Sequence, residues 1–306
     1  MYTTKTCSAI LLCVTIFVCS QQQATAGIHA PGDTIVYETP VKIADTFSFT
    51  EGPAVDRSGN VYFTDQPNNR ILKYDLDGRL TVFMQPAGRS NGMYVDAAGN
   101  LISCADEKDQ LWSISPDKEV TVLIKDFNGA RMNGPNDVWI APDGGMYLTD
   151  PYYQRDYWKR QAPDPAIKGR YVYYLPKGSR TLQPVDTTLQ QPNGIVGTPD
   201  GKHLYVADIK AGKTYRYDIG EKGQLIHKQL FAPMGSDGMT IDSQGNIYLT
   251  GKGVTVFNPQ GEKIGHIPIP EPWSANVCFY GKDRQYLFVT ASKTVYLVKM
   301  AIPGNL

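Results

Sequence analysis

Short alternating apolar runs, separated by glycine-containing turns, recur six times along the chain. Each copy holds an apolar run, a turn and a second alternating run such as residues 61–64, Val-Tyr-Phe-Thr. An alternation with a period of two predicts β-strands, and two such runs joined by a short turn predict a β-hairpin. The first five copies share a glycine eight residues after their first residue, at Gly59, Gly99, Gly144, Gly201 and Gly245.

The first residue of every copy is polar, in one common register. These residues are Glu51, Asn91, Asn136, Asn193, Asp237 and Asn276, at spacings of 40, 45, 57, 44 and 39 residues. A third strand-like run follows each hairpin, for example at residues 71–74, and a fourth follows that, for example at residues 80–83.

Six repeats of four antiparallel strands predict an all-β fold, a six-bladed β-propeller. The sixth copy ends after its third strand near Met300, so residues 41–47 are expected to supply its fourth strand. That pairing would close the ring by joining the N- and C-terminal segments. No linker interrupts residues 27–306, which are expected to form one domain. The regular period disfavours the alternative of an open sandwich.

Residues 1–26 have the pattern of a signal peptide. Lys5 precedes an apolar run of 11 residues at 9–19, and Ala24-Thr25-Ala26 fits a cleavage site before Gly27. The run is too short to span a bilayer as a helix, although a retained N-terminal anchor is the alternative. The mature protein is therefore expected to be exported, to the periplasm or the extracellular space, with no membrane segment.

Composition limits the classes of binding partner and the kinds of catalytic site that the sequence favours. Lys and Arg together equal Asp and Glu, 30 each, so no charge excess indicates nucleic acid or an anionic membrane. There is no C-x-x-C motif, and the four histidines lie outside the repeat register. Cys104 and Cys278 remain after cleavage; two buried free thiols are preferred, and a disulfide between them stays open.

The polar register predicts a ring of side chains. The first strand of each propeller blade lines the central channel, so equivalent residues should surround the axis. Asn or Asp before Gly is also common in turns, which is the alternative for any single copy. Buried carboxylates need charge partners, and a divalent cation would balance Glu51 and Asp237. Because the ring holds only oxygen donors, Ca²⁺ is preferred, with Mn²⁺ and Mg²⁺ as alternatives.

Several motifs together resemble the gluconolactonase and regucalcin-like family. They are EGP at Glu51, SNGM at Ser90, RMNGPND at Arg131, PNG at Pro192 and SDGM at Ser236, in order along nearly all of the mature chain. The resemblance implies a six-bladed propeller that hydrolyses lactones with calcium or another divalent cation. This family is similar to the propellers that hydrolyse organophosphates.

The resemblance also implies roles for particular residues. Glu51, Asn193 and Asp237 would be metal ligands, Asn136 a fourth ligand or a substrate contact, and Asp237 the catalytic acid or base. The remaining ring amides, Asn91 and Asn276, are expected to contact the substrate. Gly134 stands where the animal branch has a sugar-binding arginine, which leaves Arg131 and Asn133 as substitutes.

The expected function is hydrolysis of a small-molecule lactone such as glucono-1,5-lactone. Other lactones or phosphotriesters are alternatives, as is a non-catalytic propeller that binds a ligand or protein. Residues 151–170 are an insertion between the second and third strands of the third blade. Its aromatic residues form either a lid over the channel or a loop folded onto their own blade. Asp65, Asp106, Asp150 and Asp208 end second strands and are expected to cap turns, with a role for one of them toward a second ion or the substrate as the alternative.

Overall fold

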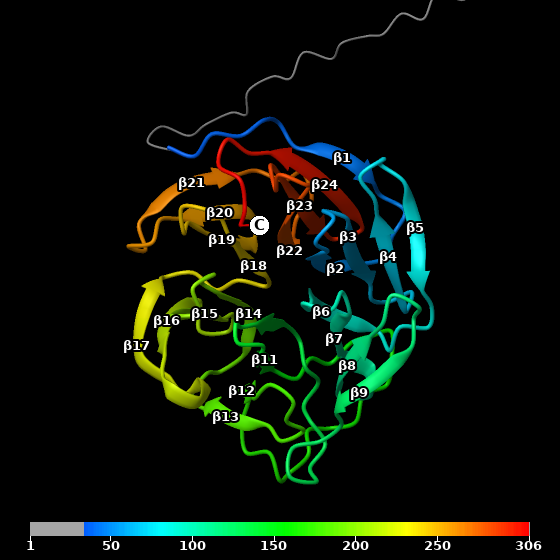
Figure 1. Cartoon of the computed structure of the whole chain (residues 1–306), viewed down its shortest axis with the longest axis vertical. Coiled ribbons are helices and arrows are strands. Elements are labelled where there is room, and N and C mark those ends of the chain that lie inside the picture. Colours follow the sequence, from blue (N-terminus) through cyan, green and yellow to red (C-terminus); the bar gives the residue numbers. More distant parts are fainter. Residues whose placement is uncertain (1–33, 306) are drawn as a thin grey trace, which may run out of the picture.

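A computed structural model describes residues 34–305 and shows a six-bladed β-propeller. Six four-stranded antiparallel sheets stand around a central axis (Figure 1). The predicted all-β class and blade number are therefore confirmed. The helices in the described part of the chain are two short 3-10 turns, η1 (Asp106–Lys108) and η2 (Glu221–Gly223). None of its helices could cross a membrane. The predicted signal peptide lies outside the described residues.

Blades one to five run outward from the channel in chain order. Blade one holds β2 (Thr50–Val55), β3 (Val61–Asp65), β4 (Arg70–Tyr74) and β5 (Leu80–Met84). Blade two holds β6 (Ser90–Val95), β7 (Leu101–Ala105), β8 (Gln110–Ile114) and β9 (Val120–Ile124). Blade three holds β10 (Val138–Ile140), β11 (Met146–Asp150), β12 (Tyr171–Leu175) and β13 (Gln183–Asp186).

The second half of the chain repeats the arrangement. Blade four holds β14 (Pro192–Gly197), β15 (His203–Asp208), β16 (Lys213–Ile219) and β17 (Leu225–Ala232). Blade five holds β18 (Met239–Ile241), β19 (Ile247–Gly251), β20 (Gly253–Phe257) and β21 (Lys263–Ile267). Blade six holds β22 (Ser274–Tyr280), β23 (Tyr286–Ala291), β24 (Thr294–Lys299) and, from the N-terminal side, β1 (Val41–Ala44).

The two ends of the chain close the ring as predicted. β1 pairs antiparallel with β24, with Val41 opposite Leu297 and Lys42 opposite Tyr296. The strand is shorter than the expected 41–47, and beyond it Phe47 packs edge-to-face on Phe63 of blade one with ring centroids 5.3 Å apart. The closing segment therefore also contacts the first blade.

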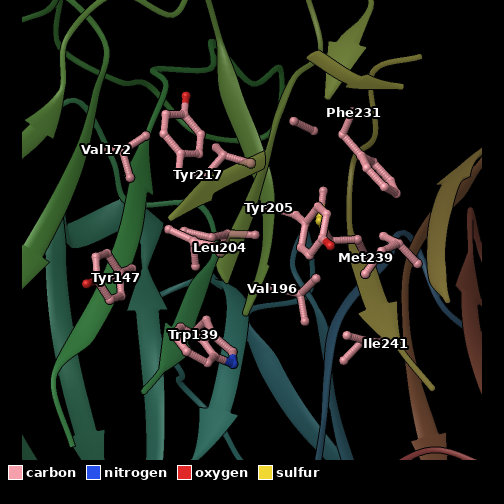
Figure 2. Packing of buried hydrophobic residues seen from close by; sticks show 14 of the residues in the cluster. Trp139, Tyr147, Val172, Val196, Leu204, Tyr205, Tyr217, Phe231, Met239 and Ile241 are labelled. Atoms are coloured by element: carbon pink, nitrogen blue, oxygen red, sulfur yellow. The ribbon is translucent and has the colours of Figure 1, made fainter. Parts of the chain in front are cut away.

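Apolar side chains fill the spaces between neighbouring blades. One buried cluster joins Trp139 and Tyr147 of blade three to Leu204 of blade four and Met239 of blade five (Figure 2). Because each sheet is sandwiched between two others, both of its faces carry apolar residues. The buried Tyr217 keeps a polar partner, since its hydroxyl donates to Asp186 Oδ2 at 2.7 Å. Cys104 and Cys278 are buried free thiols in different clusters, as preferred from the sequence.

Glycines beside the polar register let the innermost strands approach closely. A Cβ on Gly52 would lie 2.0 Å from the Asn91 carbonyl oxygen, and one on Gly238 would lie 2.0 Å from Asn276 Cγ. The pairs Glu51-Gly52, Asn91-Gly92 and Asn193-Gly194 lie within strands β2, β6 and β14. The turn interpretation is therefore wrong for these three pairs, since the glycine makes room for the next blade.

We expect Gly238→Ala to lower the free energy of unfolding by about 1–3 kcal/mol, because the methyl group overlaps the buried Asn276 side chain. The matched control is Gly220→Ala, where the nearest atom would lie at an ordinary 3.4 Å, and it should change stability by less than about 0.5 kcal/mol. Urea unfolding of both variants checks this. Equal losses of stability in the two variants would show that the inner strands can move apart at Gly238 without a free-energy cost.

Candidate functional site

The predicted polar ring lies at one end of the inner strands. Glu51, Asn91, Asn193 and Asn276 belong to β2, β6, β14 and β22, whereas Asn136 and Asp237 directly precede the short inner strands β10 and β18. Five of the six residues are buried, and Asp237 is half-buried. Strand pairing is interrupted next to several of them, for example between Glu51 and Ala54 and between Pro192 and Ile195. Such irregularities turn side chains out of the ladder and toward the axis.

Threonine hydroxyls fix the ring from the neighbouring blade. Thr149 Oγ1 on β11 donates to the Asn193 carbonyl of the next blade at 2.9 Å, and Thr250 Oγ1 on β19 donates to the Ala275 carbonyl at 2.9 Å. Thr64 makes the equivalent contact with the Asn91 carbonyl at 3.5 Å. All three contacts are buried, so the register of one blade is tied to that of the next.

Asn193 and Asp237 are joined directly. Asn193 Nδ2 donates to Asp237 Oδ1 at 2.7 Å and to the Tyr153 hydroxyl at 2.8 Å. Trp273 Nε1 donates to the other carboxylate oxygen, Asp237 Oδ2, at 2.6 Å. With both amide hydrogens used in this way, Asn193 Oδ1 is left as a buried acceptor without a partner in the described part of the chain.

Two acidic side chains, Glu51 and Asp237, share this region, and neither forms an ion pair with a residue of the described part of the chain. Burial, and then the charge of Asp237, raise the pKa of Glu51 well above its usual value, and its Oε2 accepts a hydrogen bond from Gly52 N at 3.0 Å. Burial also raises the pKa of Asp237, against the hydrogen bond from Trp273 and the charge of Arg155. Two desolvated carboxylates that repel one another are stabilised when a cation lies between them.

The donor set fits a hard divalent cation. Glu51 and Asp237 supply two negative charges, and Asn193 Oδ1 is a buried oxygen that lacks a hydrogen bond. Among residues 34–305, no three His, Cys, Asp or Glu side chains form a metal-binding group by themselves, so an ion here would need amide oxygens as well. Carboxylate and amide oxygens are the ligands that calcium accepts in irregular geometry.

Asp137 is a buried carboxylate that the sequence analysis missed. Burial raises its pKa to about 7, against hydrogen bonds from the backbone of Val138 and Ile195 and from the Asn276 side chain. It lines a channel cavity of about 440 Å³, as the ring residue Asn276 does. A signal was present, since the residue after the ring position is glycine in four copies and aspartate only here.

The insertion lies over the ring and does not fold back onto blade three alone. Tyr157 donates to Gln66 Oε1 of blade one at 2.5 Å, and Tyr153 reaches Asn193 of blade four. Arg160 binds Asp106 Oδ1 and, at 3.1 Å, Asp109 Oδ1, both from blade two. The segment therefore spans the channel mouth, which favours the lid over the alternative of a loop on its own blade.

The other predicted substrate contacts differ in how free their side chains are. The Asn133 amide donates to the Asp150 and Gly169 carbonyls at 3.2 and 3.0 Å, and Arg131 pairs with Asp109 at 3.2 Å. Both side chains are thus used to hold the base of the insertion. Asn276 binds Asp137 and Val277 N, whereas the buried Asn91 Nδ2 has no partner within residues 34–305. Their roles toward a substrate stay predictions.

Three of the four strand-end aspartates cap loops as expected. Asp65 accepts from Ser48 and Phe49 N–H groups, and Asp208 accepts from Gln190 and Gln191 N–H groups. Asp150 does the same for Asn133 at 2.9 Å. Each cap holds the loop that enters the inner strand of its own blade. Asp106 departs from the pattern because its carboxylate binds Gln66 and Arg160 instead.

Comparison with known proteins agrees with this architecture. The chain is 27% identical over 291 residues to a gluconolactonase of Zymomonas mobilis, with 85% of this chain and 81% of that protein covered. It is 26% identical over 288 residues to the diisopropyl-fluorophosphatase of Loligo vulgaris, with 84% and 88% covered. A solved gluconolactonase from Xanthomonas campestris superposes with a TM-score of 0.81 at 26% identity, with 92% of this chain and 96% of that chain covered.

Most of the chain also matches one family profile. The profile described as SMP-30/Gluconolactonase/LRE-like region covers residues 49–293, from the strand that carries Glu51 to the loop between β23 and β24. This span includes all six ring positions and the insertion. The chain therefore belongs to the SMP-30/gluconolactonase/LRE-like family.

Proposed function

We propose that this protein hydrolyses the ring ester of a small-molecule lactone, in particular a sugar lactone such as glucono-1,5-lactone, with a bound divalent cation, calcium foremost. The observation that carries the proposal is the pair of Glu51, which is buried, and Asp237, which is half-buried, beside Asn193 Oδ1, which has no hydrogen-bond partner within residues 34–305. A ligand-binding propeller without catalysis would not require two unpaired carboxylates at its axis. Gluconolactonase relatives support the same substrate class.

The reaction needs polarisation of the carbonyl and a proton acceptor. A divalent cation, when bound by Glu51, Asn136, Asn193 and Asp237, would supply Lewis-acid polarisation of the lactone carbonyl. Asp237 accepts the proton of the attacking water and returns it to the ring oxygen as the C–O bond breaks. Trp273 and Asn193 hold the two oxygens of Asp237 in place for that transfer. The lid of residues 151–170 limits the access of bulk water.

A second candidate substrate class is the phosphotriesters. The similarity to a diisopropyl-fluorophosphatase favours it, and a P=O group is polarised in the same way as a C=O group. We further propose that the protein acts outside the cytoplasm after cleavage near Ala26, on the sequence pattern of residues 1–26.

Hydrolysis of glucono-1,5-lactone, followed as proton release, should be lost with a chelator and restored by calcium. Asp237→Asn should lower kcat by about 10²- to 10⁴-fold, the contribution of a general base. The control Asp200→Asn, at an exposed loop of blade four, should retain full activity. An Asp237→Asn protein that turns over at the wild-type rate contradicts the assigned role, and absence of turnover on lactones and phosphotriesters favours a binding propeller.

Calcium should stabilise the wild-type protein, by about 2.7 kcal/mol at a hundredfold excess over Kd. In Glu51→Gln this stabilisation should disappear, since one of two buried negative charges is gone. The metal-free variant should nevertheless melt at or above the temperature of the metal-free wild type, because the repulsion between Glu51 and Asp237 is removed. Calorimetric scans with chelator and with calcium measure both effects. A calcium shift of unchanged size in the variant would remove Glu51 from the ligand set.

Tyr153→Phe should weaken calcium binding by about tenfold, because outer residues that orient metal ligands typically contribute that much. The variant removes the hydroxyl that receives Asn193 Nδ2 at 2.8 Å and leaves the hydrogen bond to Asp237 Oδ1 to orient the amide. Tyr152→Phe is the matched control, since that hydroxyl donates to Gln154 Oε1 at 3.1 Å on the surface. Titration calorimetry compares the two. Equal affinities would mean that Asn193 is oriented by Asp237 alone.

A further inference from the structure

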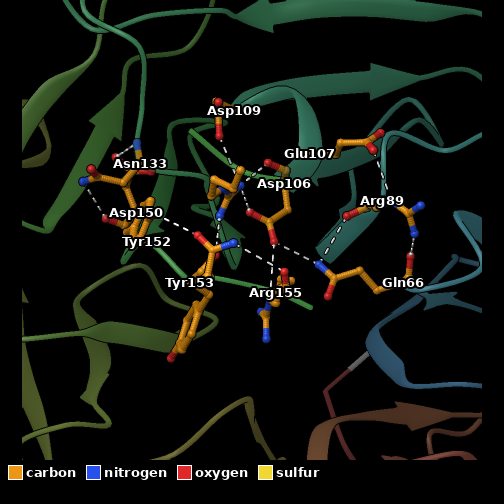
Figure 3. Close-up of polar contacts among 12 residues, drawn as sticks. Gln66, Arg89, Asp106, Glu107, Asp109, Asn133, Asp150, Tyr152, Tyr153 and Arg155 are labelled. Atoms are coloured by element: carbon orange, nitrogen blue, oxygen red, sulfur yellow. Dashed lines mark hydrogen bonds and ion pairs between the residues drawn. The ribbon is translucent and has the colours of Figure 1, made fainter. Parts of the chain in front are cut away.

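Arg155 brings a positive charge from the insertion to the polar ring. Its guanidinium stacks on the Tyr153 ring, with 4.6 Å between the guanidinium carbon and the ring centroid. Tyr153 is itself bonded to Asn193, so the arginine is placed by a rigid contact with the ring. Its charge acts on both Glu51 and Asp237, and its side chain is only 19% exposed. Figure 3 shows Arg155 below Asp106, with a dashed line joining the two side chains.

The guanidinium of Arg155 lacks the carboxylate partners that two nearby arginines have, namely Arg160 in the insertion and Arg131 at its base. Arg160 is bonded to Asp106 and Asp109, and Arg131 pairs with Asp109 at 3.2 Å. Arg155 Nε lies 4.0 Å from Asp106 Oδ2, and that oxygen already accepts from Gln66. Arg155 Nε is buried and has no hydrogen-bond partner within residues 34–305. A buried charged donor without an acceptor is costly unless a ligand supplies one.

A divalent cation would make this imbalance larger. Glu51 and Asp237 would then be neutralised by the ion, and Arg155 would lose the two carboxylates whose charge it now feels. An arginine and a cation close together repel each other unless an anion lies between them. A carboxylate matches the planar fork of a guanidinium and can accept two hydrogen bonds from it.

We propose that Arg155 is an anion-binding residue of the substrate site and selects lactones that carry a free carboxylate. The inference rests on the proposed lactonase function for its substrate class, but the anion subsite is a property of the chain itself. A carboxylate on the lactone lies against Arg155 while the ring ester faces Asp237. The carboxylate that hydrolysis creates competes for the same guanidinium.

Two lactones of equal ring size separate this role from general catalysis. D-glucaro-1,4-lactone carries a carboxylate where D-glucono-1,4-lactone carries a hydroxymethyl group. We expect Arg155→Met to lower kcat/KM for the charged lactone by about 10- to 150-fold, as for a lost charged hydrogen bond. The neutral lactone should lose only about two- to tenfold, as for a neutral one. Arg155→Lys should recover part of the preference because it keeps the charge without the fork.

Binding provides a readout that does not depend on turnover. Titration of D-glucarate into the calcium-loaded protein should give weaker binding in Arg155→Met than in wild type, whereas the neutral polyol sorbitol should bind both alike. Calcium alone should bind Arg155→Met more tightly, because a nearby positive charge is gone. Lys159→Met, an exposed cation of the same insertion, is the matched control and should behave as wild type in every arm.

The outcomes are distinguishable. Equal losses on both lactones, or unchanged glucarate binding in Arg155→Met, would overturn the anion subsite. If the wild type hydrolyses no lactone, the proposed function fails, and the glucarate and calcium titrations alone decide whether Arg155 binds anions. If Arg155→Met melts well below wild type, Arg155→Lys is used for the test instead. In that variant, an unchanged ratio of kcat/KM for the charged lactone to kcat/KM for the neutral lactone would count against the proposal.

Discussion

Glu51 and Asp237 approach one another at the end of the propeller channel, and the burial of these two carboxyl groups is the constraint that the site depends on. Burial raises the pKa of both groups, and neither forms an ion pair with any of residues 34–305. Such an arrangement persists only because the blades around it are well packed and because hydrogen bonds from Gly52, Trp273 and Asn193 hold the carboxylates. A bound cation would relieve the repulsion, which links folding, metal binding and activity.

The propeller holds the ring residues in place by repeating one local arrangement of residues in successive blades. A polar residue, then usually a glycine, begins the inner strand of a blade, and the glycine permits backbone contact with the next ring residue. A threonine of the second strand donates to the carbonyl of the following blade, and an aspartate at the end of that strand caps the loop before the first. Blade three has Asp137 in place of the glycine, and this residue lines the channel cavity.

The insertion adds what the repeat cannot supply. It rises from blade three and contacts blades one, two and four through Tyr157, Arg160 and Tyr153. Asp106, which in other blades would cap a loop, is used instead to anchor it. The anchored insertion places Arg155 and Tyr153 at the mouth of the site. The repeat itself supplies only the acids and amides of the ring.

The sequence by itself determined the blade number, the strand order, the closure of the ring and the polar register, because all of these follow from a periodicity of apolar, polar and glycine positions. It also predicted that residues 151–170 form either a lid over the channel or a loop folded onto blade three, without deciding between the two. Tertiary structure alone decided which side chains meet. Tyr153, Arg155 and Gln66 are distant in sequence from the ring, and Asp137 interrupts the repeat, so no local pattern places them at the axis. The side chains of Arg131 and Asn133 adjoin the motif in sequence, but packing directs them to the base of the insertion, since contacts between blades depend on three-dimensional position and not on spacing along the chain.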